Sequence, residues 1–147
     1  MRRNPFKGII HIEAVLTPSR NQMDKLIKSN NIKKIKKMKR DYDIAVYASV
    51  PCLFNRTSAA IYDHVFAYAI RCSKRRLDHT NLIGGLKWLE DALVRCEVIK
   101  DDSPNNITWV GKCAEERSPR HWGKLRGPCT HLLLSETEEK LLKFVNS

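Results

Sequence analysis

The spacing of apolar and polar residues divides the first third of this chain into one strand and one interrupted helix. Residues 8–16 are rich in β-branched side chains and predict a strand, which ends where Pro18 and short polar residues favour a turn. From residue 21 to residue 50 the apolar positions keep roughly helical spacing, with lysines on the opposite face. This pattern predicts a long amphipathic helix that is interrupted near residues 29–31 and stopped by Pro51.

The remaining sequence alternates between strand and helix patterns. Residues 62–71 favour a second strand, although Ala67 and Ala69 leave a helix open. A leucine stripe predicts a helix over residues 81–95, with Thr80 as its N-cap. A short extended piece, a turn, two strands and a terminal helix are expected at residues 97–99, 101–106, 107–113, 129–134 and 136–147. This order predicts a single domain over residues 1–147 of the α/β (α+β) class, a small mixed sheet packed against two or three helices.

The charge balance is unusual for a small domain and indicates one that binds phosphate groups. Lys and Arg number 27 against 16 Asp and Glu, a net charge of +11. Such an excess is typical of proteins that bind nucleic acid, although an anionic membrane surface or an acidic protein would also suit it. No apolar run is long enough to span a bilayer, and the N-terminus does not have the pattern of a signal peptide. We therefore expect a cytoplasmic protein with no membrane contact.

Cysteines and histidines are scattered along the sequence. The five cysteines lie at least 16 residues apart, with no Cys-x-x-Cys pair. This spacing favours reduced, mostly buried thiols over a disulfide framework or a zinc finger. His11, His64, His121 and His131 are likewise interpreted as incidental and not as ligands.

Carboxylates at both ends of one short unit stand out in so basic a chain. Asp78 precedes the helix predicted over residues 81–95, and Asp101 and Asp102 follow it. That helix would rise about 22 Å, and the residues after it, if extended, would return about 23 Å. Asp102 can therefore reach Asp78, where a pair of aspartates would be enough to hold Mg²⁺. The same residues could also lie at opposite ends of the unit.

Simpler explanations exist for each of these residues. Asp78 could cap the following helix, and Asp101 and Asp102 could form a turn before Pro104. Asp91 lies four residues after Lys87, so we interpret it as a structural ion-pair partner of that lysine. Lys87 itself is either a site residue or a surface ion-pair partner.

The order of these residues matches a known pattern. Arg-x-Leu-Asp-x-x-Asn-Leu at residues 75–82 is followed by Lys87, by Asp91-Ala92-Leu93 and then by an Asp-Asp pair, while Thr17-Pro18-Ser19-Arg20-Asn21 comes after the first strand. This arrangement resembles the RusA family of Holliday junction resolvases, common in phages and prophages. The resemblance implies a RusA-like fold and a homodimeric endodeoxyribonuclease that uses Mg²⁺ or Mn²⁺ and nicks four-way DNA junctions symmetrically. It implies that Asp78 and Asp102 match catalytic metal ligands and that Lys87 matches a catalytic or DNA-contacting lysine. We interpret Asn81 as structural at the site.

One departure from the family pattern concerns the metal ligands. Where the family has Asp-x-Asp-Asn, this chain has Asp78-His79-Thr80-Asn81, so one carboxylate is missing. In an extended backbone Thr80 would point to the same side as Asp78 and could offer its hydroxyl to the metal. Asp101 or His79 could also compensate. Alternatively, the site is weakened and the protein binds junctions without cutting them.

Basic residues are the expected DNA contacts, through backbone phosphates. The lysine-rich run is either such a contact or a solvated helix face. The set comprises Lys33, Lys34, Lys36, Lys37, Arg71, Lys74, Arg75, Arg76, Arg120 and Lys124. Gly84 and Gly85 interrupt a predicted helix, which indicates a close approach by another backbone, for which a dimer partner or DNA is a candidate.

Three functional classes follow from these observations. The first is a structure-selective nuclease acting as a dimer. The second is a DNA-binding protein without catalytic activity. The third is an RNA-binding or phage-regulatory protein in which the acidic motif is coincidental.

Overall fold

The computed structural model of the chain describes residues 9–50, 61–73, 77–115 and 128–146. These residues form four strands and five helices. In chain order they are β1 (Ile10–Val15), α1 (Arg20–Lys28), α2 (Ile32–Ser49), β2 (Val65–Cys72), α3 (His79–Gly85), α4 (Lys87–Arg95), β3 (Ile107–Glu115), β4 (Cys129–Ser135) and α5 (Glu138–Val145). Five predicted DNA contacts lie outside the described residues: Lys74, Arg75, Arg76, Arg120 and Lys124.

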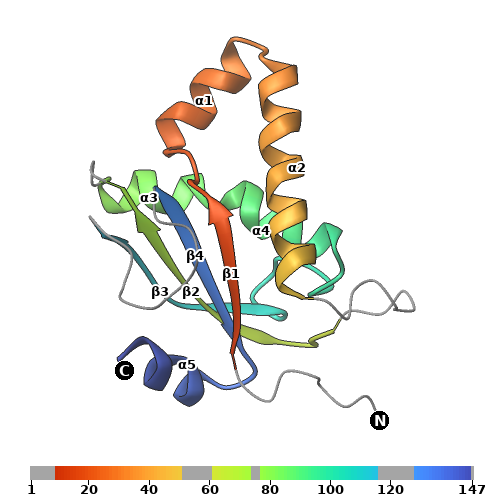
Figure 1. Cartoon of the computed structure of the whole chain (residues 1–147), viewed down its shortest axis with the longest axis vertical. Helices are drawn as coiled ribbons and strands as arrows, with labels where there is room; N and C mark the ends of the chain where they lie inside the picture. Colours follow the sequence, from red (N-terminus) through yellow and green to blue (C-terminus); the bar gives the residue numbers. More distant parts are fainter. Residues whose placement is uncertain (1–8, 51–60, 74–76, 116–127, 147) are drawn as a thin grey trace.

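The strands form one sheet in the order β1-β4-β2-β3 (Figure 1). β4 pairs antiparallel with both β1 and β2, whereas β2 and β3 run parallel. The crossover from β2 to β3 carries α3 and α4, as a parallel connection requires. The predicted small mixed sheet of an α+β protein is therefore confirmed.

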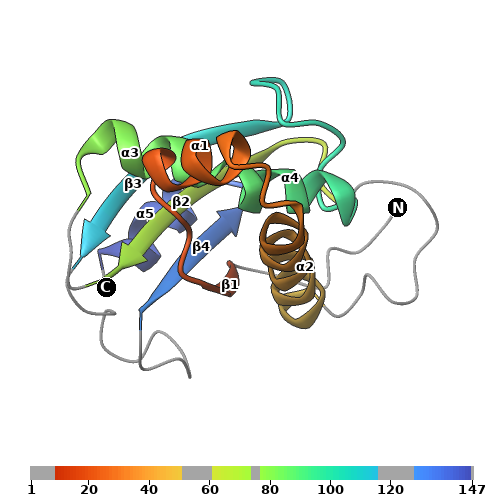
Figure 2. The same cartoon turned by 90° about the horizontal axis from the view of Figure 1, so that it is seen from above.

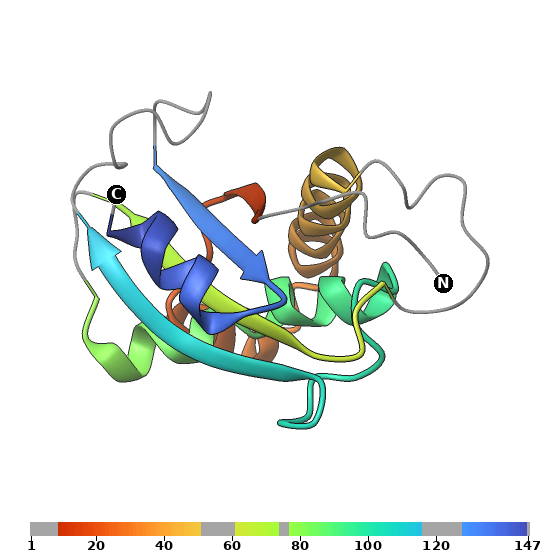
Figure 3. The same cartoon turned by 90° about the horizontal axis from the view of Figure 1, so that it is seen from below.

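One face of the sheet carries the main core. Alternate residues of β1, β2 and β4, such as Ile12, Ala67 and Leu132, are fully buried in one cluster with side chains of α1, α2 and α4, including Tyr42 and Leu89. Figure 2 shows α1, α3 and α4 lying along this side of the sheet. On the opposite face, α5 packs over β2 and β4 (Figure 3).

The interrupted helix predicted for residues 21–50 is confirmed. Ser19 caps α1 through a reciprocal pair of hydrogen bonds with Gln22. Asn30 adopts a positive φ of 54°, a conformation that Asn tolerates better than most residues, and Asn31 then caps α2. The chain therefore turns between α1 and α2.

The segment predicted as one helix with Thr80 as its N-cap differs in two respects. It forms α3 and α4, separated at Leu86, and the N-cap is Asp78. Thr80 consequently lies in the first turn of α3, so the extended geometry that would align it with Asp78 is absent. Among the described helices none has the length and hydropathy to cross a membrane.

Candidate functional site

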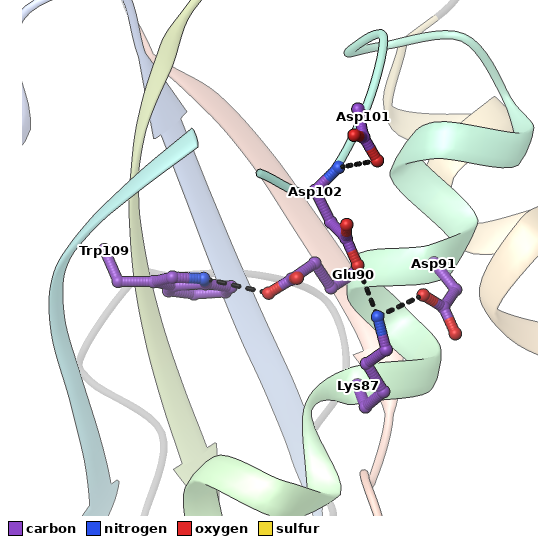
Figure 4. A network of polar contacts seen from close by, with 6 residues as sticks. All are labelled: Lys87, Glu90, Asp91, Asp101, Asp102 and Trp109. Carbon is purple, nitrogen blue, oxygen red and sulfur yellow. Dashed lines mark hydrogen bonds and ion pairs between the residues drawn. The ribbon is translucent and has the colours of Figure 1, made fainter. Parts of the chain in front are cut away.

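Lys87, the first residue of α4, is the centre of a charged network (Figure 4). Its Nζ atom donates to Asp102 Oδ2 and lies 2.9 Å from Asp91 Oδ1. Asp101 joins the network through its Oδ1 atom, which accepts a hydrogen bond of 2.8 Å from the backbone N–H of Asp102. The predicted pairing of Lys87 with Asp91 is confirmed, and the structure brings Asp102 to the same lysine.

Glu90 and Trp109 extend this network toward β3. The indole Nε1 atom of Trp109 donates to Glu90 Oε2 over 2.9 Å, and the Lys112 ammonium lies 4.4 Å from the centre of the indole ring. Lys87, Glu90 and Lys112 line a pocket of about 370 Å³ that also borders α1. The sequence did not single out Glu90, whose position one turn after Lys87 is the only signal that could have done so.

The electrostatics of the network follow from these contacts. Hydrogen bonds to Asp102 and Asp91 raise the pKa of Lys87, so it is an ammonium at neutral pH and supplies a positive charge rather than a base. The same contact with Lys87 lowers the pKa of Asp102, which keeps that carboxylate ionised. Burial raises the pKa of Glu90, against the opposing hydrogen bond from Trp109.

A second group of polar residues lies at the start of α3. Asp78 accepts hydrogen bonds of 2.9 Å from both the backbone N–H and the side-chain amide of Asn81. Both bonds lower the pKa of Asp78, and the bond from the backbone N–H has the larger effect. The side-chain Oδ1 atom of Asn81 accepts in turn from the backbone N–H of Asn21, 60 residues earlier in the chain. Asn81 therefore acts as a structural residue beside Asp78.

The loop after β1 packs directly against α3. A Cβ atom on Gly85 would lie 1.7 Å from the carbonyl oxygen of Pro18, so only glycine fits there. The close backbone approach expected at the glycine pair is thus present, and the chain's own loop supplies it. Two separate segments of the recognised pattern, residues 17–21 and 78–85, lie in contact.

The buried side chain of Arg71 binds the loop after β1. It is only 5% exposed, and its Nε atom donates to the carbonyl oxygen of Thr17 over 2.8 Å. Arg71 therefore does not belong to an exposed basic surface, contrary to its prediction as a surface DNA contact. It lines, with Asn21, Ser73 and Asn81, a pocket of about 330 Å³ beside the start of α3.

The donor chemistry of the aspartates fits Mg²⁺, but their arrangement is not the expected shared site. Nine residue steps along mostly helical chain lead from Asp78 to Lys87, a rise of roughly 13 Å. Asp102 comes back only as far as Lys87 at the start of α4, and Ile99, three residues before it, forms an isolated β-bridge with Tyr62. In the part of the chain that the structure describes, Asp78, Asp101 and Asp102 form no group with ligand atoms within 4.8 Å of one another. Thr80 is exposed on α3, apart from the Lys87 network.

The predicted basic helix face is fully accessible. Lys33, Lys34, Lys36 and Lys37 are all exposed along the first half of α2. Lys37 forms a salt bridge of 3.3 Å with Asp41, one turn farther along α2. The four ammonium groups are thus placed on a surface that a polyanion can approach.

Another cluster was missed by sequence reasoning. Cys72, Cys129 and His131 have their ligand atoms within 4.8 Å of one another, and all three residues are buried. Cys72 and Cys129 are paired across β2 and β4, and the alternation Cys129-x-His131 puts two of the residues on one strand face. That alternation was the available signal, since the cysteines themselves are far apart in sequence.

Comparison with known proteins assigns no family. No family model matches the chain, and no curated protein or solved structure matches it significantly.

Proposed function

We propose that this protein is a Mg²⁺-dependent endodeoxyribonuclease that acts on branched DNA, of the kind the RusA family represents. The observation that carries the proposal is the contact between Lys87 and Asp102, which are 15 residues apart in sequence. Both residues were selected from the sequence as site residues, and they meet on the surface of α4. A protonated lysine beside ionised carboxylates is a combination suited to phosphodiester chemistry.

Charge complementarity supports a role for a cation. Asp91, Asp101 and Asp102 surround one ammonium, so the network carries more negative than positive charge. Such a surface repels a DNA phosphate unless a cation lies between them. Mg²⁺ suits this position because it binds through one or two carboxylates together with water and substrate phosphates. Asp102 would hold the ion, which would offset charge developing on the phosphodiester, while Lys87 contributes a second positive charge.

DNA would be bound through the accessible lysines of α2. Lys33, Lys34, Lys36 and Lys37 would contact backbone phosphates without reading the sequence of bases. Symmetric incision of a junction calls for two sites related by a two-fold axis, so the proposal includes a homodimer.

A second candidate function is DNA binding without cleavage. It is favoured by the separate partners of Asp78 and Asp102: Asn81 holds the first, and Lys87 holds the second. If Asp78 stays hydrogen-bonded to Asn81 and Asp102 stays paired with Lys87, the protein keeps its fold and its basic surface but does not assemble a metal site.

The two candidates are separated by a cleavage assay on several substrates. Purified protein is incubated with a labelled four-way junction, a linear duplex of the same sequence and a matching RNA, each with Mg²⁺. The proposal predicts symmetric nicks in the junction and little cleavage of the other two substrates. Glu139→Gln, an exposed carboxylate on α5, serves as the matched control and should cleave normally. Tight junction binding without any nicks would favour the second candidate, and a preference for RNA would contradict both.

A further inference from the structure

A cluster of sulfur and nitrogen atoms lies on the face of the sheet opposite the main core. Cys72 of β2 and Cys129 of β4 are directly paired, and His131 is two residues farther along β4. Cys129 and His131 are fully buried, and Cys72 is 2% exposed. Their ligand atoms all lie within 4.8 Å of one another.

The distances fit a metal bound by thiolates and imidazole. The Cys129 Sγ and His131 Nε2 atoms are 3.4 Å apart. In a tetrahedral zinc site with ordinary Zn–S and Zn–N bond lengths, a sulfur and a nitrogen ligand are separated by about 3.5 Å. The Cys129–His131 edge therefore already has the length that coordination requires.

The orientation of His131 is fixed from its other side. Its Nδ1 atom lies 2.8 Å from Nε2 of His11 on β1. When Nδ1 carries the proton and donates to His11, the Nε2 lone pair of His131 points toward Cys129. Metal-bound histidines commonly have this arrangement, in which a second group holds the other ring nitrogen.

The charges of the cluster suit a divalent ion in a buried place. Two thiolates and one neutral imidazole around a divalent cation carry no net charge, so no uncompensated charge is buried. Soft thiolate ligands with imidazole favour Zn²⁺ over Mg²⁺. Cys113 of β3 packs against the same small cluster.

We propose that Cys72, Cys129 and His131 form a zinc-binding site that joins β2 to β4, with His11 as the residue that positions His131. Binding of Zn²⁺ releases the two thiol protons to solvent, and the bonds formed are two Zn–S bonds and one Zn–N bond. The site is on the other side of the sheet from Lys87 and Asp102. Zinc binding and the proposed cleavage of DNA can therefore be lost independently.

The test measures metal uptake by the full chain after treatment with a chelator. Titration with Zn²⁺ should end at one ion per chain and raise the thermal midpoint of unfolding. With Co²⁺ as a probe, the unmodified protein should develop the near-ultraviolet charge-transfer absorption of thiolate coordination. Absence of both uptake and this absorption would overturn the proposal, and this result does not depend on whether any variant folds.

Variants assign the ligands. Cys72→Ser and Cys129→Ser should each weaken Zn²⁺ binding by about 100-fold or more, and His11→Phe by about 10- to 100-fold, as expected for a residue that orients a ligand. Cys96→Ser is the matched control, since Cys96 is also a buried thiol but lies beyond α4. Uptake that Cys129→Ser leaves unchanged, or that Cys96→Ser abolishes, would contradict the assignment.

Discussion

The Lys87 ammonium, at the start of α4, contacts the carboxylate of Asp102, which follows α4 in the sequence. It also contacts Asp91, one turn along the same helix. All three side chains are about one third exposed or more. Exposed ion pairs contribute little to stability, at most about 1 kcal/mol. The position of Lys87 is therefore better explained by what its charge does to neighbouring groups than by what it adds to the fold.

Replacing Lys87 with Met tests this explanation. The pKa of Asp102 should rise toward its ordinary value, as followed by NMR titration of the side-chain carboxyl, because its positive neighbour is lost. The free energy of unfolding should change by less than about 1 kcal/mol, and junction cleavage should fall by about 100-fold or more. Lys87→Arg, which keeps the charge, should leave the pKa of Asp102 low. A large loss of stability in Lys87→Met would show instead that the lysine is structural.

The close approach of Pro18 to Gly85 predicts an unusual response to alanine. Alanine normally stabilises a helix relative to glycine by about 1 kcal/mol. Gly85→Ala should nevertheless destabilise the protein by about 2 kcal/mol or more, because the new Cβ meets a main-chain oxygen and the loop after β1 has to move. Gly84→Ala should cost less, since it meets side-chain atoms of the exposed Arg20. Urea unfolding of both variants makes the comparison, and a stabilised Gly85→Ala would be incompatible with this packing.

The half-buried Glu90 predicts a dependence of stability on pH. Its pKa is raised by burial, whereas in the unfolded chain it titrates near pH 4.3. Between the two values the folded protein holds a proton that the unfolded chain has released, so stability is lost as the pH rises through that window. Glu90→Gln keeps the acceptor for Trp109 and removes the titration. This variant should be more stable than the unmodified protein at pH 7, and its free energy of unfolding should depend less on pH from about pH 4 upward.

Unfolding in urea at several pH values measures this effect. The exposed Glu139→Gln provides the control and should lower the free energy of unfolding by no more than about 1 kcal/mol, because its carboxylate lies in the first turn of α5. If Glu90→Gln were no more stable than the unmodified protein at pH 7, the cost assigned to burying this carboxylate would be contradicted.

The contribution of the α2 lysines to DNA binding can be compared with that of two lysines at the same spacing in α5. Lys33→Gln with Lys36→Gln should reduce the salt dependence of DNA binding, lowering the slope by about two because each phosphate contact contributes about one unit. Lys140→Gln with Lys143→Gln removes the same charge from exposed positions of α5, on the other face of the sheet. That pair should leave the slope nearly unchanged. Equal slopes for the two double variants would indicate that net charge alone drives binding.

Local patterns were enough to predict much of the fold. The break between α1 and α2 follows from Asn30, because a short polar residue tolerates the positive φ that the turn requires. The ion pair of Lys87 with Asp91 follows from helical spacing alone. Both features depend on residues close together in the sequence, which is why the pattern contains them.

Features that depend on tertiary packing were beyond the sequence. Arithmetic on chain length allowed Asp102 to reach Asp78, but in the structure Asp102 contacts Lys87 instead. Thr80 was expected beside Asp78 in an extended chain, yet the carboxylate of Asp78 starts the helix there. The pairing of Cys72 with Cys129 depends on the register of β2 against β4, which no local spacing reveals.

The central claim is that Asp102 serves a metal-dependent cleavage of branched DNA. The most direct measurement is the single-turnover rate at which saturating protein incises a labelled four-way junction with Mg²⁺, for the unmodified chain and for Asp102→Asn. The account predicts paired, symmetric nicks by the unmodified chain. It also predicts a rate at least about 100-fold lower for Asp102→Asn, with junction binding retained. Binding without incision by the unmodified chain, in either Mg²⁺ or Mn²⁺, or equal rates for the two proteins, would contradict it.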